Sequence, residues 1–370
     1  MPEKSLMPMT NARLSLFSSA ILSVLCGAAW AAPAAPLQQV ATLRVPGKPL
    51  KVFDISFVNA DGVYALADRS NSGLDLFKAA TGVFLGRATG FAGFDPAKGW
   101  EHAGPDGVVA VGDHEFWAGD GDSAVKVVDL RTKKVIASIR TGGHRLTDQL
   151  AFDPRDHVVV AINNADDPPF VTFISTHTRK VLGRVVLKQA TGGAKQMVWD
   201  SGSKLIYLAL PSIDGHKSRG AVAVIDPRAR KLVRLLPVLR CMPAGLAVEA
   251  GGKLLVGCSY RSVSRGFPAR SFVMTTGGQI VARLQGVVGS DEIWSNPVAH
   301  RYYLANLSHA GGPVLSVINS LTNRLLQNLP TGPRAHSVAA DARTGRVFVP
   351  IAAGPGSCPE GCIEVFGAAK

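Results

Sequence analysis

The stretches YYLANL (residues 302–307) and VINSLTNRL (residues 317–325) decide which fold the sequence predicts. The first is a short apolar run, which is typical of a strand. The second has two apolar residues, then a polar turn, then a return to leucine, which predicts a hairpin. Together with the apolar residues just before YYLANL, they predict four consecutive strands joined by turns and a polar loop.

This pattern recurs along the chain. The counterparts of YYLANL are VYALAD (63–68), EFWAGD (115–120), VVVAIN (158–163), LIYLAL (205–210), LLVGCS (254–259) and VFVPIA (347–352). The repeats are 43 to 52 residues apart, and helical periodicity is absent outside the first thirty residues. A solenoid is the alternative, but four strands per repeat at this period are typical of propeller blades. We therefore expect an all-β fold, a seven-bladed β-propeller of four-stranded blades.

The ends of the chain predict how the ring closes. The last repeat stops at CIEVFG (362–367), which leaves no room for a fourth strand, whereas QVATLRV (39–45) precedes the first repeat. An N-terminal strand that completes the last blade would remove an open sheet edge. We expect residues 32–370 to form a single propeller domain closed in this way.

The repeats also resemble a known family. Tyr303-Leu304-Ala305-Asn306, followed by VINSLTNR, is similar to the YVTN-type repeats of YncE-like bacterial propellers. The resemblance covers most of the chain and implies a seven-bladed propeller in an exported protein. Related seven-bladed domains include non-enzymatic binders, lactonases and electron-transfer scaffolds, so the resemblance does not select an activity.

Residues 1–31 have the features of a secretory signal peptide that is cleaved near Ala31. Lys4 and Arg13 precede the apolar run LSLFSSAILSVLCGAAWA (14–31), which ends in an A-x-A cleavage site. A membrane anchor is the alternative, but the run is short and no charged stop-transfer flank follows it. We expect a periplasmic or secreted protein that does not span a membrane. We also expect the protein to be a monomer.

Four cysteines remain beyond the predicted signal peptide, an even number that suggests disulfides in an exported chain. Cys358 and Cys362 flank a short loop containing proline and glycine, and Cys241 and Cys258 should lie near one mouth of the channel. We expect the pairs Cys241–Cys258 and Cys358–Cys362, with free buried thiols as the alternative. C-x-x-C-H and Walker motifs are absent, so we expect neither c-type haem nor a nucleotide.

The formal net charge of +13 favours an anionic or other small-molecule ligand. Surface solubility is the alternative explanation of this charge. Helix-turn-helix, zinc-finger and RNP-like patterns are absent, so we expect no nucleic-acid partner.

Polar residues begin strands that are otherwise apolar. Aligned across the seven repeats, the leading residues are Asp54, Asp106, Gln149, Gln196, Ala244, Glu292 and His336. Because the innermost strand of each blade lines the channel, six polar side chains should meet at one mouth. Carboxylates suit Ca²⁺ and a histidine admits Zn²⁺, so we predict a divalent metal held by Asp54, Asp106, Glu292 and His336. Simple solvation of a wet channel mouth is the alternative.

Two functions follow from this ring. The first is a metal-assisted hydrolase, such as a lactonase, with Glu292 and His336 as catalytic residues. Its predicted substrate-binding residues are Gln149, Gln196, Asp148, Lys195, His144 and Asp291. The second is a non-catalytic propeller that binds a ligand or partner in the same funnel. The absence of G-x-S-x-G and H-E-x-x-H motifs removes the two commonest hydrolase signatures.

Overall fold

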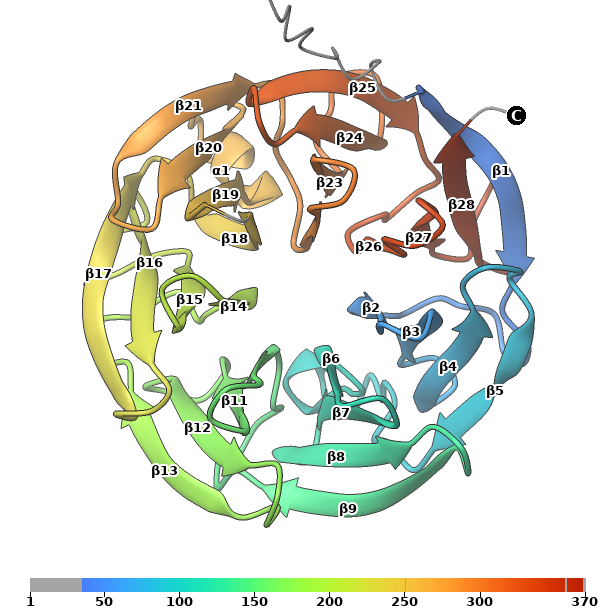
Figure 1. Cartoon of the computed structure of the whole chain (residues 1–370), viewed down its shortest axis with the longest axis horizontal. Helices are drawn as coiled ribbons and strands as arrows, with labels where there is room; N and C mark the ends of the chain where they lie inside the picture. Colours follow the sequence, from blue (N-terminus) through green and yellow to red (C-terminus); the bar gives the residue numbers. More distant parts are fainter. Residues whose placement is uncertain (1–34, 250, 357, 369–370) are drawn as a thin grey trace, which may run out of the picture. The chain divides into compact units, whose positions relative to one another are not determined.

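Seven four-stranded antiparallel sheets are arranged in a ring around a central axis (Figure 1). The computed structural model describes residues 35–249, 251–356 and 358–368, and 28 strands lie within these ranges. This arrangement confirms the predicted seven-bladed β-propeller. The predicted signal peptide, with Cys26, lies outside the described residues.

The strands are best grouped by their distance from the channel. The innermost strands are β2 (Ser56–Val58), β6 (Val108–Val111), β10 (Leu150–Asp153), β14 (Met197–Asp200), β18 (Pro243–Glu249), β22 (Ile293–Asn296) and β26 (Ala339–Ala340). The second strands are β3 (Val63–Asp68), β7 (Glu115–Asp120), β11 (Val158–Asn163), β15 (Leu205–Leu210), β19 (Lys253–Cys258), β23 (Arg301–Asn306) and β27 (Val347–Ile351).

The remaining strands form the outer half of each blade. The third strands are β4 (Gly73–Lys78), β8 (Ala124–Asp129), β12 (Phe170–Ser175), β16 (Arg219–Asp226), β20 (Arg270–Thr275), β24 (Val314–Asn319) and β28 (Cys362–Ala368). The outermost strands are β5 (Phe84–Thr89), β9 (Lys134–Arg140), β13 (Val181–Val186), β17 (Lys231–Leu239), β21 (Ile280–Gln285), β25 (Arg324–Pro330) and β1 (Leu37–Arg44).

Burial explains the sequence pattern of each layer. The second strand β11 is buried at every residue, because both its faces pack against neighbouring blades. The outermost strand β9 alternates between exposed residues and residues that are partly or fully buried, as expected where one face meets solvent. Apolar clusters join adjacent blades. In one of them, Leu66 and Leu76 of the first blade share a core with Phe116 and Val128 of the second. The core therefore lies between the blades.

The N-terminal strand closes the ring, as predicted. β1 pairs antiparallel with β28, from Leu37 opposite Ala368 to Arg44 opposite Cys362. The last blade is thus built from both ends of the described chain (Figure 1).

Both predicted disulfides are present. Cys241–Cys258 joins the segment before β18 to the end of β19, and Cys358–Cys362 closes the short loop before β28. Two short helices complete the described structure, the 3₁₀ helix η1 (Trp100–His102) and α1 (Tyr260–Ser264). No helix among the described residues is long and apolar enough to cross a membrane.

Candidate functional site

Backbone hydrogen bonds sort the polar channel residues into two layers. The amide of Asp148 donates to the Ile162 carbonyl at 2.8 Å, and the amide of Ile162 donates to the Gln149 carbonyl at 3.1 Å. The same pair of bonds surrounds Asp54 and Ile55, Asp106 and Gly107, and Lys195 and Gln196. Asp54, Asp106, Asp148 and Lys195 are therefore equivalent positions, and Gln149 and Gln196 lie one residue deeper in the channel.

The sixth and seventh blades follow the same rule. Ile293 pairs with Leu304 and Ala339 pairs with Phe348, so counting back along each strand places Asp291 and His336 opposite the last residues of β23 and β27. We call Asp54, Asp106, Asp148, Lys195, Asp291 and His336 the upper layer, and Gln149, Gln196, Glu292 and Ser337 the lower layer. The sequence alignment of the repeats placed Gln149, Gln196 and Glu292 at the position equivalent to Asp54. This was wrong by one residue in each of these three blades.

The upper layer lies around a cavity of about 780 Å³, which we call the funnel. Every upper-layer residue lines it except Asp106, which is completely buried. Side chains from other segments complete its wall, chiefly Arg69, Trp100, Asn164, Tyr260 and Arg261. The funnel thus combines acidic, basic and aromatic groups.

Three carboxylates cluster on one side of the funnel. Ligand oxygens of Asp54, Asp106 and Asp148 lie within 4.8 Å of one another. The Arg69 guanidinium forms ion pairs with both Asp54 and Asp106. Asn164 donates a hydrogen bond to Asp148, and burial, helped by the charge of Asp54, raises the pKa of Asp148 to about 7. Arg69 and a proton on Asp148 both reduce the repulsion within this cluster.

The other side of the funnel holds charges without direct ionic partners. Among the described residues, Lys195, Arg261 and Asp291 form no ion pair within 4.0 Å. The charge of Asp291, with those of Asp148 and Asp54, outweighs desolvation and raises the pKa of Lys195. Lys195 and Arg261 also line two adjoining hollows of about 620 and 70 Å³. All three side chains line the funnel and are therefore accessible from it.

Local structure fixes the position of Arg261. It lies in the first turn of α1, where the Ser259 side chain caps the helix by accepting from the Arg261 amide. The Arg261 Nε donates to the Tyr260 hydroxyl at 3.1 Å. The disulfide Cys241–Cys258 lies just before this cap, so it anchors the segment that carries Tyr260 and Arg261.

The two histidines predicted for the site have different surroundings. His336 stacks on Phe53, with ring centroids 4.6 Å apart, and its Nε2 lies 3.9 Å from Asp54 Oδ1. His144 is exposed, its backbone amide donates to Asp166, and it is not among the residues that line the funnel. The structure therefore brings His336, but not His144, to the upper layer.

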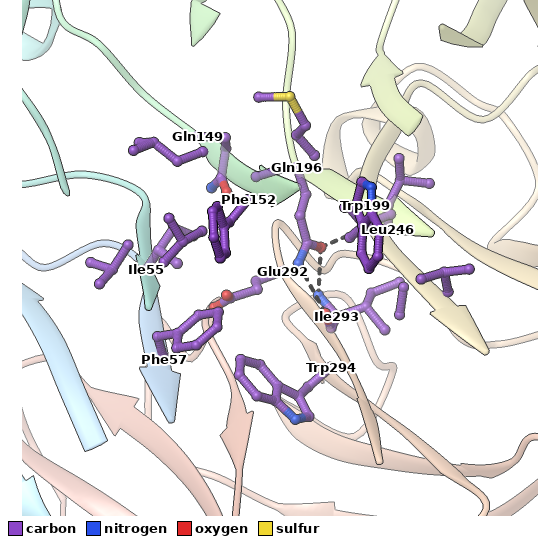
Figure 2. Close-up of a pocket in the computed structure, with 18 of the residues that line it drawn as sticks. Ile55, Phe57, Gln149, Phe152, Gln196, Trp199, Leu246, Glu292, Ile293 and Trp294 are labelled. Atoms are coloured by element: carbon purple, nitrogen blue, oxygen red, sulfur yellow. Dashed lines mark hydrogen bonds between the residues drawn. The ribbon is translucent and has the colours of Figure 1, made fainter. Parts of the chain in front are cut away.

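A second cavity of about 340 Å³, which we call the chamber, is lined by three lower-layer residues, Gln149, Gln196 and Glu292 (Figure 2). Gln196 is fully engaged there, since its Oε1 accepts from the Leu246 and Ile293 amides and its Nε2 donates to the Ile293 carbonyl. Glu292 Oε2 accepts from the Ser337 hydroxyl and from the Val338 amide. Burial raises the pKa of Glu292 to about 8.

The predicted metal-ligand set is therefore divided between the layers. Asp54, Asp106 and His336 belong to the upper layer, and Glu292 belongs to the lower one. Asp148, which was not in the predicted ligand set, is the third carboxylate of the cluster with Asp54 and Asp106. Arg69 and Arg261, which follow the ends of second strands, were not predicted as site residues. Their only signal was their place in the polar loops that face the same mouth.

Comparisons with known proteins support the fold. No family model matches the chain, and no curated protein matches it. Among solved structures, a chain of Kuenenia stuttgartiensis hydrazine synthase is similar, with a TM-score of 0.70 and 13% sequence identity. The match covers 88% of this chain and 97% of that chain. At this identity the likeness shows the propeller fold alone.

Proposed function

We propose that this protein is a non-catalytic binding propeller that holds a small zwitterionic molecule in the funnel. The observation that carries the proposal is the set of charges without ionic partners on one wall. Lys195 and Arg261 can bind an anionic group, and Asp291 can bind a cationic one. Charge-assisted hydrogen bonds are about twice as strong as neutral ones, so both ends of such a ligand would contribute.

The rest of the funnel fits this role. Trp100 and Tyr260 line it and offer ring faces to an apolar or cationic part of the ligand. The Asp54–Asp106–Arg69 cluster is already paired internally, so we assign it to holding the upper layer together. A volume of about 780 Å³ is within the range of small-molecule sites.

A matched series of phenylalanine derivatives tests the proposal by calorimetry. Phenylalanine carries both charges, its N-acetyl derivative keeps only the anion, and its amide keeps only the cation. We expect phenylalanine to bind at least about tenfold more tightly than either derivative, because each loses one charge-assisted contact. Equal affinities for all three, or no binding of any of them, would overturn the proposal.

Two substitutions locate the binding site. Lys195→Gln should weaken phenylalanine binding roughly 10- to 100-fold and leave the amide derivative little changed. Asp291→Asn should do the reverse, weakening the amide derivative and sparing the N-acetyl one. Lys188→Gln, at an exposed lysine outside the funnel, is the control. Loss of affinity in that control to the same extent would assign the effect to net charge alone.

A metal-assisted hydrolase or lactonase is the second candidate. The observation in its favour is the carboxylate cluster of Asp54, Asp106 and Asp148, in which Asp106 Oδ2 has no hydrogen-bond partner among the described residues. Three carboxylates suit Ca²⁺, which would polarise a carbonyl group or a bound water. Arg69 weighs against this candidate because it already supplies positive charge to two of them.

Calcium titration by calorimetry decides between the two candidates. If the second is right, the wild type binds about one Ca²⁺ per chain, Asp148→Asn abolishes that binding, and the exposed control Asp113→Asn keeps it. If the first is right, all three proteins give the same isotherm.

We further propose that the protein is exported and related to the YncE-like propellers. The two disulfides support an oxidising compartment. Sequencing the N-terminus of the protein recovered from the periplasm or medium tests this, with cleavage expected after Ala31. An uncleaved protein recovered from the cytoplasm would contradict it.

A further inference from the structure

We propose that the chamber is a second binding site, separate from the funnel, for an uncharged aromatic molecule that carries a hydroxyl or carbonyl group. The two cavities share no lining residue among those described. The chamber is therefore a distinct site in the lower part of the channel, and it does not depend on the function proposed for the funnel.

Aromatic side chains from four blades form the wall of the chamber. Phe57, Phe152, Trp199 and Trp294 lie around the opening in Figure 2, with aliphatic residues such as Ile55 and Leu246 between them. Phe57 and Trp294 pack edge to face, with ring centroids 5.0 Å apart and planes at 73°. Such rings offer edges and faces to a planar guest. The wall thus selects an aromatic ligand over a flexible polar one.

Two polar groups at this wall have no partner within the described structure. Gln149 is 7% exposed and lines the chamber, but its side-chain amide makes no hydrogen bond to any described residue. The indole Nε1 of Trp199 is buried and likewise unsatisfied. The Gln149 amide is therefore free to hydrogen-bond to a ligand in the chamber, whereas the Trp199 indole nitrogen is too enclosed to be reached from it.

The contrast with Gln196 strengthens this inference. Gln196 occupies the equivalent position in the next blade and uses both its oxygen and its nitrogen to bind the backbone of other blades. Gln149 has no comparable structural contact. A buried amide that the fold does not use is the feature expected of a ligand-binding group.

The chamber also selects against charged ligands. Glu292 is the single ionisable residue among its described lining residues, and burial keeps its pKa at about 8. Its carboxyl group is therefore mostly protonated at neutral pH. An ion placed there would lose its hydration without a charged partner. A cavity of about 340 Å³ lies near the lower end of small-molecule sites, which suits one or two fused rings.

2-Naphthol is a suitable probe, with naphthalene and 2-naphthoate as its apolar and anionic relatives. We expect 2-naphthol to bind at one site per chain at about pH 6, measured by calorimetry and by quenching of tryptophan fluorescence. Naphthalene should bind about tenfold more weakly because it lacks the hydrogen bond, and 2-naphthoate should be weaker still. Failure of 2-naphthol to bind, or tighter binding of 2-naphthoate, would overturn the proposal.

Substitutions separate this site from the funnel. Gln149→Leu should lower the affinity for 2-naphthol about tenfold and leave that for naphthalene unchanged. Gln189→Leu is the matched control at an exposed glutamine, and Lys195→Gln is the control in the funnel. An effect of Lys195→Gln equal to that of Gln149→Leu would place the probe in the funnel and refute the proposal. Equal losses for naphthol and naphthalene in Gln149→Leu would refute the role of the amide.

Discussion

Deletion of residues 37–46 should leave the propeller unfolded or destabilise it by more than about 4 kcal/mol, a loss at the upper end of what local changes cause. The segment contains β1, which supplies the fourth strand of the last blade. Its removal takes away the backbone pairing with β28 from Leu37 to Arg44 and two buried apolar residues, Leu37 and Val45. β28 would become an open edge in a fold whose ring depends on closure.

Urea unfolding and size-exclusion chromatography measure this effect. The truncated chain should unfold at a lower urea concentration than the full chain, or aggregate through its new edge. A synthetic peptide of residues 37–46 should restore part of the lost stability, because pairing with β28 needs no covalent link. A truncated protein with the same urea midpoint as the full chain would show that pairing of β1 with β28 does not stabilise the propeller.

Most of this fold can be predicted from the sequence, because the apolar residues in each repeat mark the strands that are buried. A second strand such as VVVAIN (158–163) is buried on both faces, so every residue in it is apolar except the last. The last repeat lacks a fourth strand, and the sequence of residues 39–45 indicates a strand outside the repeats. These two features together predict that the N-terminal strand closes the ring. The Cys241–Cys258 disulfide followed from the predicted positions of its strands near one mouth, and Cys358–Cys362 followed from the short loop between its two cysteines.

The site was harder to predict because it depends on register. Each inner strand begins after a loop of different length, and the sequence does not mark its first residue. Side chains that neighbour each other along a strand point to different places, so an error of one residue moves a group between cavities. Gln149, Gln196 and Glu292 were aligned with Asp54 for this reason. In the fifth blade a register shift between Pro243 and Leu246 hides the alignment further.

Contacts between distant segments were also beyond the sequence. Arg69 reaches Asp106 of the next blade, and Gln196 binds the backbone of Ile293. Neither pairing leaves a local pattern, because each depends on how the blades are set around the channel. The same holds for the aromatic wall of the chamber, whose four rings come from four repeats.

Glu292→Gln should stabilise the protein increasingly as the pH rises from about 4.5 to about 8. The folded state holds Glu292 with a pKa of about 8, whereas in the unfolded chain this carboxyl group should titrate near its ordinary pKa of 4.5. Below about pH 4.5 the carboxyl group is protonated in both states, so it adds no pH dependence. Between the two pKa values the unfolded state loses the proton and the folded state keeps it, which destabilises the wild type as the pH rises.

The size of the effect follows from the shift. One pKa unit corresponds to about 1.4 kcal/mol, which sets an upper limit of roughly 5 kcal/mol for this shift. We expect a gain of about 2 kcal/mol in the unfolding free energy of Glu292→Gln at pH 8, because some relaxation around the ionised group reduces the penalty. The glutamine carbonyl oxygen can still accept from Ser337 and Val338, so the folded contacts are kept.

Urea unfolding of wild type and Glu292→Gln across this pH range tests the prediction, with Glu360→Gln, at an exposed glutamate, as the control. The two stability curves should run together near pH 4 and separate up to about pH 8. The control should follow the wild type throughout. A difference that stays constant with pH would mean that Glu292 titrates alike in both states, and the chamber would then hold a charge at neutral pH. The chamber would then not select uncharged ligands as proposed, whereas the free amide of Gln149 would be unaffected.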